Sequence, residues 1–200
     1  DPSERNEMGV SFLWDYALYD GQYYVYYGPA PLLLIYYPLF WLTGMLPTEA
    51  LCAVIIALAT IPAMFYAVCG IARRYVHRPN LFLLALACMT ACLSAAGPSL
   101  MCVAGRYNNV LALTVCMMAA TVGLGLHAVS HGTASWRRTA DFLLCGVCFA
   151  LQGMCRANTL LMTTAFLAPP FVGVLADRAG TVRSKARDAL CFLVPAAAGV

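Results

Sequence analysis

Long apolar segments alternate with short polar segments along most of the chain, and this alternation predicts the fold class. An α-helix needs about 20 apolar residues to cross the roughly 30 Å hydrocarbon core of a bilayer. We therefore expect an all-α fold, a polytopic transmembrane helix bundle with five complete spans and a sixth that begins near Ala189. The five predicted spans are residues 48–72, 80–104, 107–129, 141–154 and 158–176.

Polar residues at the ends of the first span fit this helix prediction. Thr48 is a residue type that caps helix N-termini, and Glu49 places a negative charge in the first turn, where the helix dipole favours it. Arg73 and Arg74 follow at the other end, where positive charge is favoured. Pro98 interrupts the second span, and we expect a kink there because proline removes one backbone hydrogen bond.

The start of the chain is organised differently, and we expect residues 1–47 to form an external region before the helix bundle of residues 48–200. Asp20-Gly21 lies between two aromatic, strand-prone runs, a pattern that predicts a tight β-hairpin. Residues 29–43 are apolar but short and interrupted by prolines. We expect an interfacial or re-entrant helix there, and the alternative is a short, tilted span.

The composition indicates a surface that faces lipid. Hydrophobic residues make up 62% of the 200 residues and charged residues 10%, with a mean hydropathy of +0.76. A soluble domain carries about 25% charged residues, so this chain has few polar side chains to cover a surface in water. The expected partner is a lipid bilayer, and no basic run with interleaved aromatics predicts nucleic acid. Because the chain starts at Asp1 and ends in an apolar run, we interpret it as an internal fragment.

The basic residues are distributed unevenly, which predicts an orientation. Of the 12 Lys and Arg residues, nine fall in the loops at 73–79, 130–140 and 177–188. Because cytoplasmic loops of membrane proteins are enriched in Lys and Arg, we expect these loops inside and residues 1–47 outside. The nine residues are Arg73, Arg74, Arg78, Arg137, Arg138, Arg178, Arg183, Lys185 and Arg187.

The cysteines lie in or beside apolar segments, where cysteine behaves as a small hydrophobic residue. Cys145 and Cys148 have the C-x-x-C spacing of redox sites, but they fall inside a hydrophobic helix, so we favour packing over redox chemistry. No His accompanies a Cys pair at the spacing of a zinc site. We therefore predict no metal or other cofactor within these residues.

An ionisable residue at membrane depth is a functional candidate, because a charge there is expensive to bury. Arg156 lies between the two shortest predicted spans, and Asn158 follows it. The apolar segment before it, 141–154, is short, so Arg156 is expected in a cavity below the external surface. The alternative is the tip of a helical hairpin, with the guanidinium extending to water. We predict that Arg156 and Asn158 bind a substrate phosphate.

Two further groups fall on the predicted external side. Arg106 and Asn109 lie at the end of the kinked span, and a second arginine there would help to grip a phosphate bidentately. The alternative is an ordinary interfacial loop. Asp15 follows Trp14 among tyrosines, an arrangement typical of sugar binding with a carboxylate as a base, although a structural role is the alternative. For Asp20 the Asp-Gly turn is a sufficient explanation.

Two punctuated apolar motifs carry a resemblance to a known family. The first runs from Asp20-Gly-Gln-Tyr-Tyr-Val-Tyr-Tyr-Gly-Pro-Ala-Pro through Pro38 to Leu42-Thr-Gly44 and Leu46-Pro47. The second is Leu143-Leu-Cys-Gly-Val-Cys-Phe-Ala-Leu-Gln-Gly-Met-Cys-Arg-Ala-Asn158. They resemble bacterial GT-C-type membrane glycosyltransferase-like proteins, which are related to the dolichyl-phosphate-mannose protein mannosyltransferases. In that group a Gly-rich helix runs into an Arg or Lys and a second apolar helix.

The resemblance implies a fragment of a glycosyltransferase in the bacterial cytoplasmic membrane, which transfers a sugar from a polyprenyl-phosphate-linked donor at the external face. It implies an acidic base early in the first external loop, and a divalent metal that often assists in the full-length protein. That acidic motif usually follows a first span that these residues do not include, so the base is expected upstream. Asp15 lies late in the loop by comparison, and Arg156 is carried over as a phosphate-side residue.

Two other classes of protein fit the same segments. A transporter or flippase-like protein for an anionic or lipid-linked substrate would use a cavity at Arg156, although no inverted repeat is visible in the sequence. A non-catalytic assembly protein would carry degenerate sites instead. The transferase is the leading hypothesis and the transporter is the alternative.

Overall fold

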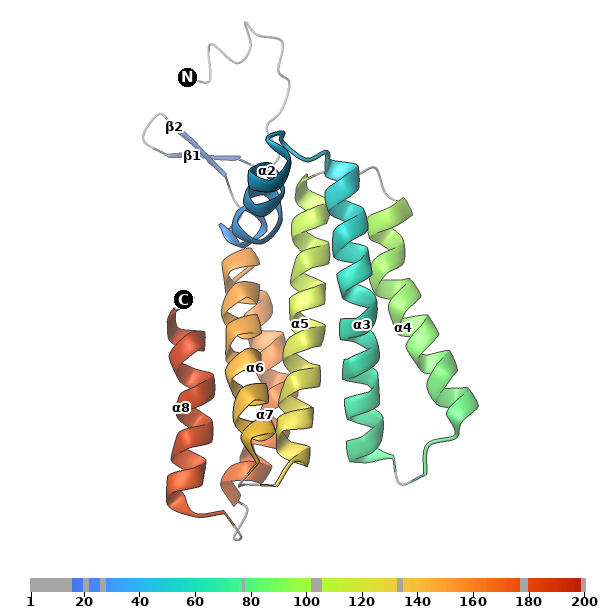
Figure 1. Cartoon of the computed structure of the whole chain (residues 1–200), viewed down its shortest axis with the longest axis vertical. Coiled ribbons are helices and arrows are strands. Elements are labelled where there is room, and N and C mark those ends of the chain that lie inside the picture. Colours follow the sequence, from blue (N-terminus) through green and yellow to red (C-terminus); the bar gives the residue numbers. More distant parts are fainter. Residues whose placement is uncertain are drawn as a thin grey trace, which may run out of the picture.

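The computed structural model describes residues 16–19, 22–25, 28–76, 78–101, 106–132, 135–176 and 180–198. This part of the chain is mainly helical, which confirms the all-α fold class apart from one short hairpin (Figure 1). The elements are β1 Tyr16–Tyr19, β2 Gln22–Val25, the π-helix η1 Leu32–Tyr36, α2 Tyr37–Thr43, α3 Glu49–Tyr75, α4 Leu81–Met101, α5 Arg106–Ser130, α6 Trp136–Cys155, α7 Thr159–Ala176 and α8 Val182–Ala198.

Helices α3 to α8 run alternately up and down in one bundle (Figure 1). Helix α5 lies in the middle and packs on α3, α6 and α7, while α8 packs on α6 and α4 packs mainly on α3. The helix ends that flank the three predicted basic loops therefore share one end of the bundle. Residues 28–43 lie at the opposite end, as the predicted orientation requires.

Two of the described helices are long and apolar enough to cross a membrane, α3 and the Asn108–Ser130 part of α5. The apolar segments Leu81–Gly97 of α4 and Thr159–Ala168 of α7 are shorter. Helix α4 lies at the edge of the bundle, and many of its large hydrophobic side chains are exposed. These exposed side chains include Leu81, Phe82, Leu83, Leu86, Met89 and Leu93. The outer surface of the bundle is therefore apolar along α4.

Helices α6 and α8 begin earlier than the sequence predicted. Helix α6 starts at Trp136 rather than at residue 141, and α8 starts at Val182 rather than near Ala189. The first turns of these helices contain five of the basic residues that suggested loops: Arg137, Arg138, Arg183, Lys185 and Arg187. Helix α6 has 20 residues, but its first turns carry Arg137, Arg138 and Asp141, so its apolar part remains short and the depth of Arg156 stays a prediction.

The region before α3 contains a hairpin and a helix at the predicted positions. Tyr16 pairs with Val25 and Tyr19 with Gln22 in antiparallel register, in agreement with the hairpin predicted from Asp20-Gly21, two residues that lie outside the described part. Helix α2 ends at Thr43. The preceding turn is a π-helix because Pro38 has no N–H and its ring clashes with a carbonyl one turn earlier in an α-helix.

We predict that Gly146→Leu separates α6 from α8. A Cβ at Gly146 would lie 2.4 Å from the backbone oxygen of Phe192 and 2.7 Å from Cγ of Pro195, so the helices would have to move apart. The expected loss is about 1–3 kcal/mol, measured as the free energy of unfolding in detergent. Gly97→Leu is the matched control, because nothing lies within 4 Å of its Cβ. Equal losses in both variants would contradict the close α6–α8 packing.

Candidate functional site

Three polar side chains meet where η1, α3 and α5 come together, at the end of the bundle away from the basic loops. We name Tyr36, Glu49 and Asn109 the Glu49 cluster. Nδ2 of Asn109 donates to Oε2 of Glu49 at 2.9 Å and to the Glu49 backbone oxygen at 3.1 Å. The Tyr36 hydroxyl donates to the same carboxylate oxygen. One carboxylate therefore joins three separate elements of the fold.

The cluster is set into an apolar core. Asn109 is 2% exposed, and its Oδ1 is buried without a hydrogen-bond partner in the described part of the chain. A buried polar atom left without a partner costs about 1–3 kcal/mol, so this oxygen is an open acceptor as far as the described residues go. Burial, and next the hydrogen bond to Glu49, raise the pKa of the Tyr36 phenol. The phenol therefore stays protonated at neutral pH and remains a donor.

Arg156 lies at the tip of the hairpin formed by α6 and α7. The backbone N–H of Arg156 donates to the backbone oxygen of Gln152 at 2.9 Å. The backbone oxygen of Arg156 accepts a hydrogen bond from Oγ1 of Thr159 at 2.7 Å. The Gln152 side chain is fully buried and donates to the hydroxyls of Thr159 and Thr163 at 2.9 and 2.7 Å. These bonds tie the two helices together next to the turn and fix the position from which the partly exposed Arg156 side chain extends. Asn158, in the same turn, is exposed.

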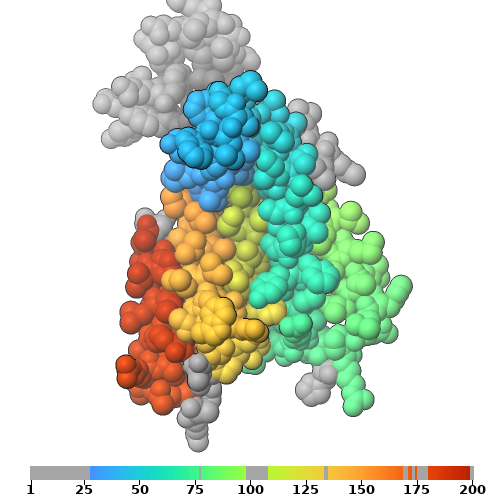
Figure 2. Space-filling model, viewed as in Figure 1, coloured from blue at the N-terminus to red at the C-terminus, as the bar shows by residue number. Residues whose placement is uncertain are grey.

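The hairpin tip and the Glu49 cluster share one core. Cys155 is buried together with Ile35 and Val110, which are the sequence neighbours of Tyr36 and Asn109. A Cβ at Gly28 would lie 1.6 Å from the Met154 backbone oxygen, so the chain before η1 crosses the end of α6 with no room for a side chain. Figure 2 shows this segment against the end of α6. The structure thus brings Arg156 and Asn109 to the same end of the bundle.

Of the other predicted site residues, the structure gives only the backbone position of Arg106. Arg106 is the first residue of α5, one turn before Asn109, so its backbone lies at the same end of the bundle. Asp15 lies outside the described residues. Tyr36 and Glu49 were not predicted as site residues, since Glu49 was explained by the helix dipole. Its place at the start of a strongly apolar helix was the one signal in the sequence that could have identified it.

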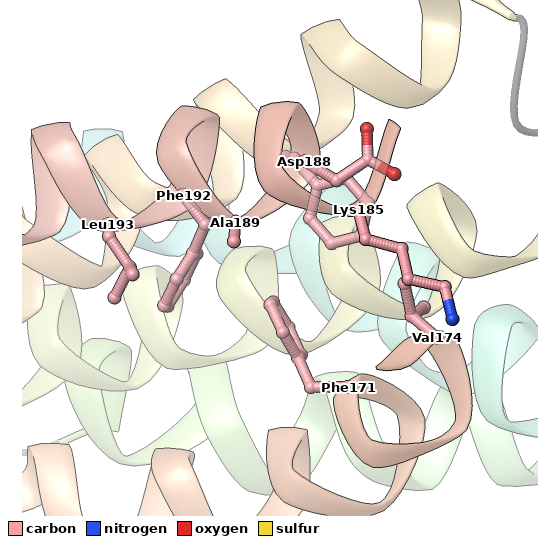
Figure 3. A pocket seen from close by; sticks show the side chains of 8 residues that line it. Phe171, Val174, Lys185, Asp188, Ala189, Phe192 and Leu193 are labelled. Atoms are coloured by element: carbon pink, nitrogen blue, oxygen red, sulfur yellow. The ribbon is translucent and has the colours of Figure 1, made fainter. Parts of the chain in front are cut away.

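A cavity of about 200 Å³ lies between α6, α7 and α8 (Figure 3). Figure 3 shows the rings of Phe171 and Phe192 on its wall, with Asp188 and Lys185 at one side. The Asp188 carboxylate accepts from Nε of Arg138 at 2.7 Å and from Nη2 of Arg187 at 3.1 Å. Because this carboxylate is engaged in ion pairs and the remaining lining is apolar, we assign this cavity to packing rather than chemistry.

The described His, Cys, Asp and Glu side chains were compared with the geometry of metal and disulfide sites. No group of three or more His, Cys, Asp or Glu residues is placed to hold a metal ion within the described part of the chain. The described cysteines, including Cys145 and Cys148, form no disulfide. Cys145 is buried and its thiol lies 3.3 Å from the Thr121 backbone oxygen, which fits the packing interpretation.

Comparison of the chain with protein-family models, with curated proteins and with solved structures gave no match. The functional argument therefore rests on the geometry of the chain itself.

Proposed function

We propose that this chain is the membrane-embedded part of a glycosyltransferase that takes its sugar from a polyprenyl-phosphate-linked donor. The observation that carries the proposal is the Glu49 cluster, with its open Asn109 acceptor, at the same end of the bundle as Arg156. Buried polar and ionisable groups in an apolar helix bundle usually serve a substrate, because they are costly to place there. The resemblance of the two sequence motifs to GT-C-type proteins supports the same substrate class.

The proposal places the bundle in the bacterial cytoplasmic membrane. Two helices of sufficient length and the exposed apolar side chains of α4 support a lipid environment. The basic helix ends would face the cytoplasm, where Lys and Arg are enriched. The Glu49 cluster, Arg156 and residues 28–43 would then lie at the external face, where the exposed Trp41 and Tyr37 suit the headgroup level.

Each side chain of the site has a proposed role. The guanidinium of Arg156, with Arg106 and Asn158, would bind the donor phosphate and stabilise the negative charge that it gains as the sugar leaves. Oδ1 of Asn109 would accept a hydrogen bond from a hydroxyl group of the sugar. Glu49 accepts hydrogen bonds from Asn109 and Tyr36, so it is a positioning residue. The base that removes the proton from the acceptor hydroxyl is proposed to be Asp15 or an acid upstream, and a divalent metal of the complete protein stays a prediction.

The test is sugar transfer by the intact protein in proteoliposomes. We expect Arg156→Ala to lower kcat/KM by about 100-fold, because a donor to the developing charge is lost. Arg156→Lys should recover part of the rate, since it keeps the charge without the bidentate geometry. Arg183→Ala, an exposed arginine at the other end of the bundle, is the control.

Two outcomes would count against this function. Unchanged turnover in Arg156→Ala would show that the arginine only ends a helix. Movement of the lipid-linked sugar across the membrane without cleavage would favour the transporter instead.

A further inference from the structure

A second, smaller cavity lies at the basic end of the bundle, between the last turns of α3 and α5. Its volume is about 100 Å³, well below the roughly 300 Å³ and more of a pocket for a drug-sized ligand. A group about as large as a phosphate suits this space better than a nucleotide or a sugar. The cavity is lined by Gly70, Arg73, Arg74, Leu126, His127 and Ser130.

Three polar side chains of this cavity, those of Arg73, Arg74 and His127, lack a hydrogen-bond partner within the described part of the chain. Arg73 and Arg74 are exposed, and neither forms a hydrogen bond or an ion pair with another described residue. The His127 ring stacks on Tyr66 with centroids 3.9 Å apart, which fixes its plane. Its Nε2 is buried and has no hydrogen-bond partner in the described part. The Ser130 hydroxyl, bonded to the His127 oxygen at 2.7 Å, lies beside it.

Among the described residues, two acids lie at this end of the bundle, and neither is in an ion pair with Arg73 or Arg74, although the Asp141 charge also acts on His127. Asp141 lies 3.4 Å from Nε2 of His131, and Asp188 pairs with Arg138 and Arg187. The two arginines of the cavity therefore keep an excess of positive charge that no described carboxylate in contact with them balances. Such a site favours an anion, and guanidinium groups bind phosphate oxygens bidentately.

We propose that this cavity binds a phosphate group, supplied by the headgroup of an anionic phospholipid. Ile71 and Tyr75, on the same turns of α3, are exposed, so the cavity lies where apolar helix surface meets the polar end. Basic pockets between helices on the cytoplasmic side are typical binding sites for such headgroups. Free phosphate offers the same oxygens, and the experiment separates the two sources. The proposal does not depend on the transferase function.

The test follows the thermal unfolding midpoint of the intact chain in an uncharged detergent, titrated separately with phosphatidylglycerol, phosphatidylcholine and inorganic phosphate. Ligand binding to the folded state raises the midpoint. We expect phosphatidylglycerol to raise it and phosphatidylcholine not to. Arg73→Gln with Arg74→Gln should raise the half-saturating lipid concentration at least tenfold. His127→Phe, which keeps a ring on Tyr66 but removes Nε2, should weaken binding as well.

The control is Arg137→Gln with Arg183→Gln, which removes the same charge from exposed positions at the same end of the bundle. If this control still binds phosphatidylglycerol, a specific site is supported. If it loses as much affinity as the Arg73 and Arg74 variant, the binding depends only on the overall positive charge and the proposal is wrong. A shift with inorganic phosphate as large as with the lipid supports the phosphate site and assigns it to free phosphate. If neither phosphatidylglycerol nor phosphate shifts the midpoint, the proposal is wrong. If the arginine variant does not fold, His127→Phe decides.

Discussion

Replacing Asp188 with Leu is expected to lower the free energy of unfolding by about 3–5 kcal/mol. Nε of Arg138 donates to Oδ2 of Asp188 at 2.7 Å, and the two side chains are 5% and 2% exposed. Without the carboxylate, the guanidinium stays buried with the His131 backbone oxygen at 3.2 Å and the Phe142 ring as its described contacts. An uncompensated buried charge is far more costly than the pair itself is stabilising.

Three further variants distinguish the loss of the ion pair from the effect of each substitution by itself. Arg138→Met should cost less than Asp188→Leu, because Arg187 still donates to the carboxylate at 3.1 Å. The double variant Arg138→Met with Asp188→Leu should recover most of the stability, since apolar residues of similar volume replace a buried ion pair well. Arg137→Met, at the exposed neighbouring position, should change stability by about 0.5 kcal/mol or less. Chemical denaturation in detergent measures all four, and a double variant as unstable as Asp188→Leu would contradict the argument.

Local sequence signals predicted the features that local interactions determine. Helix α3 starts where Thr48 predicts it, and Oγ1 of Thr48 accepts from the N–H of Leu51 at 3.3 Å. The same holds for the end of α2 at Thr43 and for the pairing of β1 with β2. A cap, a turn or a proline acts through residues within one helical turn, so a single sequence contains the whole cause.

The interactions that join distant segments were not predictable in this way. Arg138 and Asp188 are 50 positions apart, and Asn109 and Glu49 are 60 apart, so no spacing rule connects them. The first turns of α8 carry three basic residues beside Asp188 and were interpreted as a loop. Only the packing of α8 on α6 shows that the carboxylate faces inward. For the same reason, the sequence offered Asn109 and Arg156 as candidates but not the Glu49 carboxylate that fixes Asn109.

The second large effect is expected for Asn109→Asp, which changes the charge of the Glu49 cluster but not its shape. The amide nitrogen that is replaced lies 2.9 Å from Oε2 of Glu49, so two carboxylates would face each other there. Two like charges at about 4 Å repel by about 4 kcal/mol at an effective dielectric constant of about 20. Because Glu49 is partly exposed, we expect a loss of about 2–4 kcal/mol at pH 8.

The stability loss of Asn109→Asp should depend on pH, and it should grow as the pH rises. Repulsion between two facing carboxylates opposes ionisation of both, so at low pH the pair retains a proton and the repulsion is small. Asn109→Asp should then be nearly as stable as the parent chain, and its stability should fall as the pH rises. Adding Glu49→Gln again gives one amide and one carboxylate, now with the carboxylate at position 109 and the amide at position 49. This double variant should regain most of the stability that Asn109→Asp loses at high pH. The bond to the Glu49 backbone oxygen stays lost, so recovery is incomplete. Unfolding midpoints at pH 4 and pH 8 measure both variants, and a loss that is the same at the two pH values would show that Asn109 does not face the carboxylate.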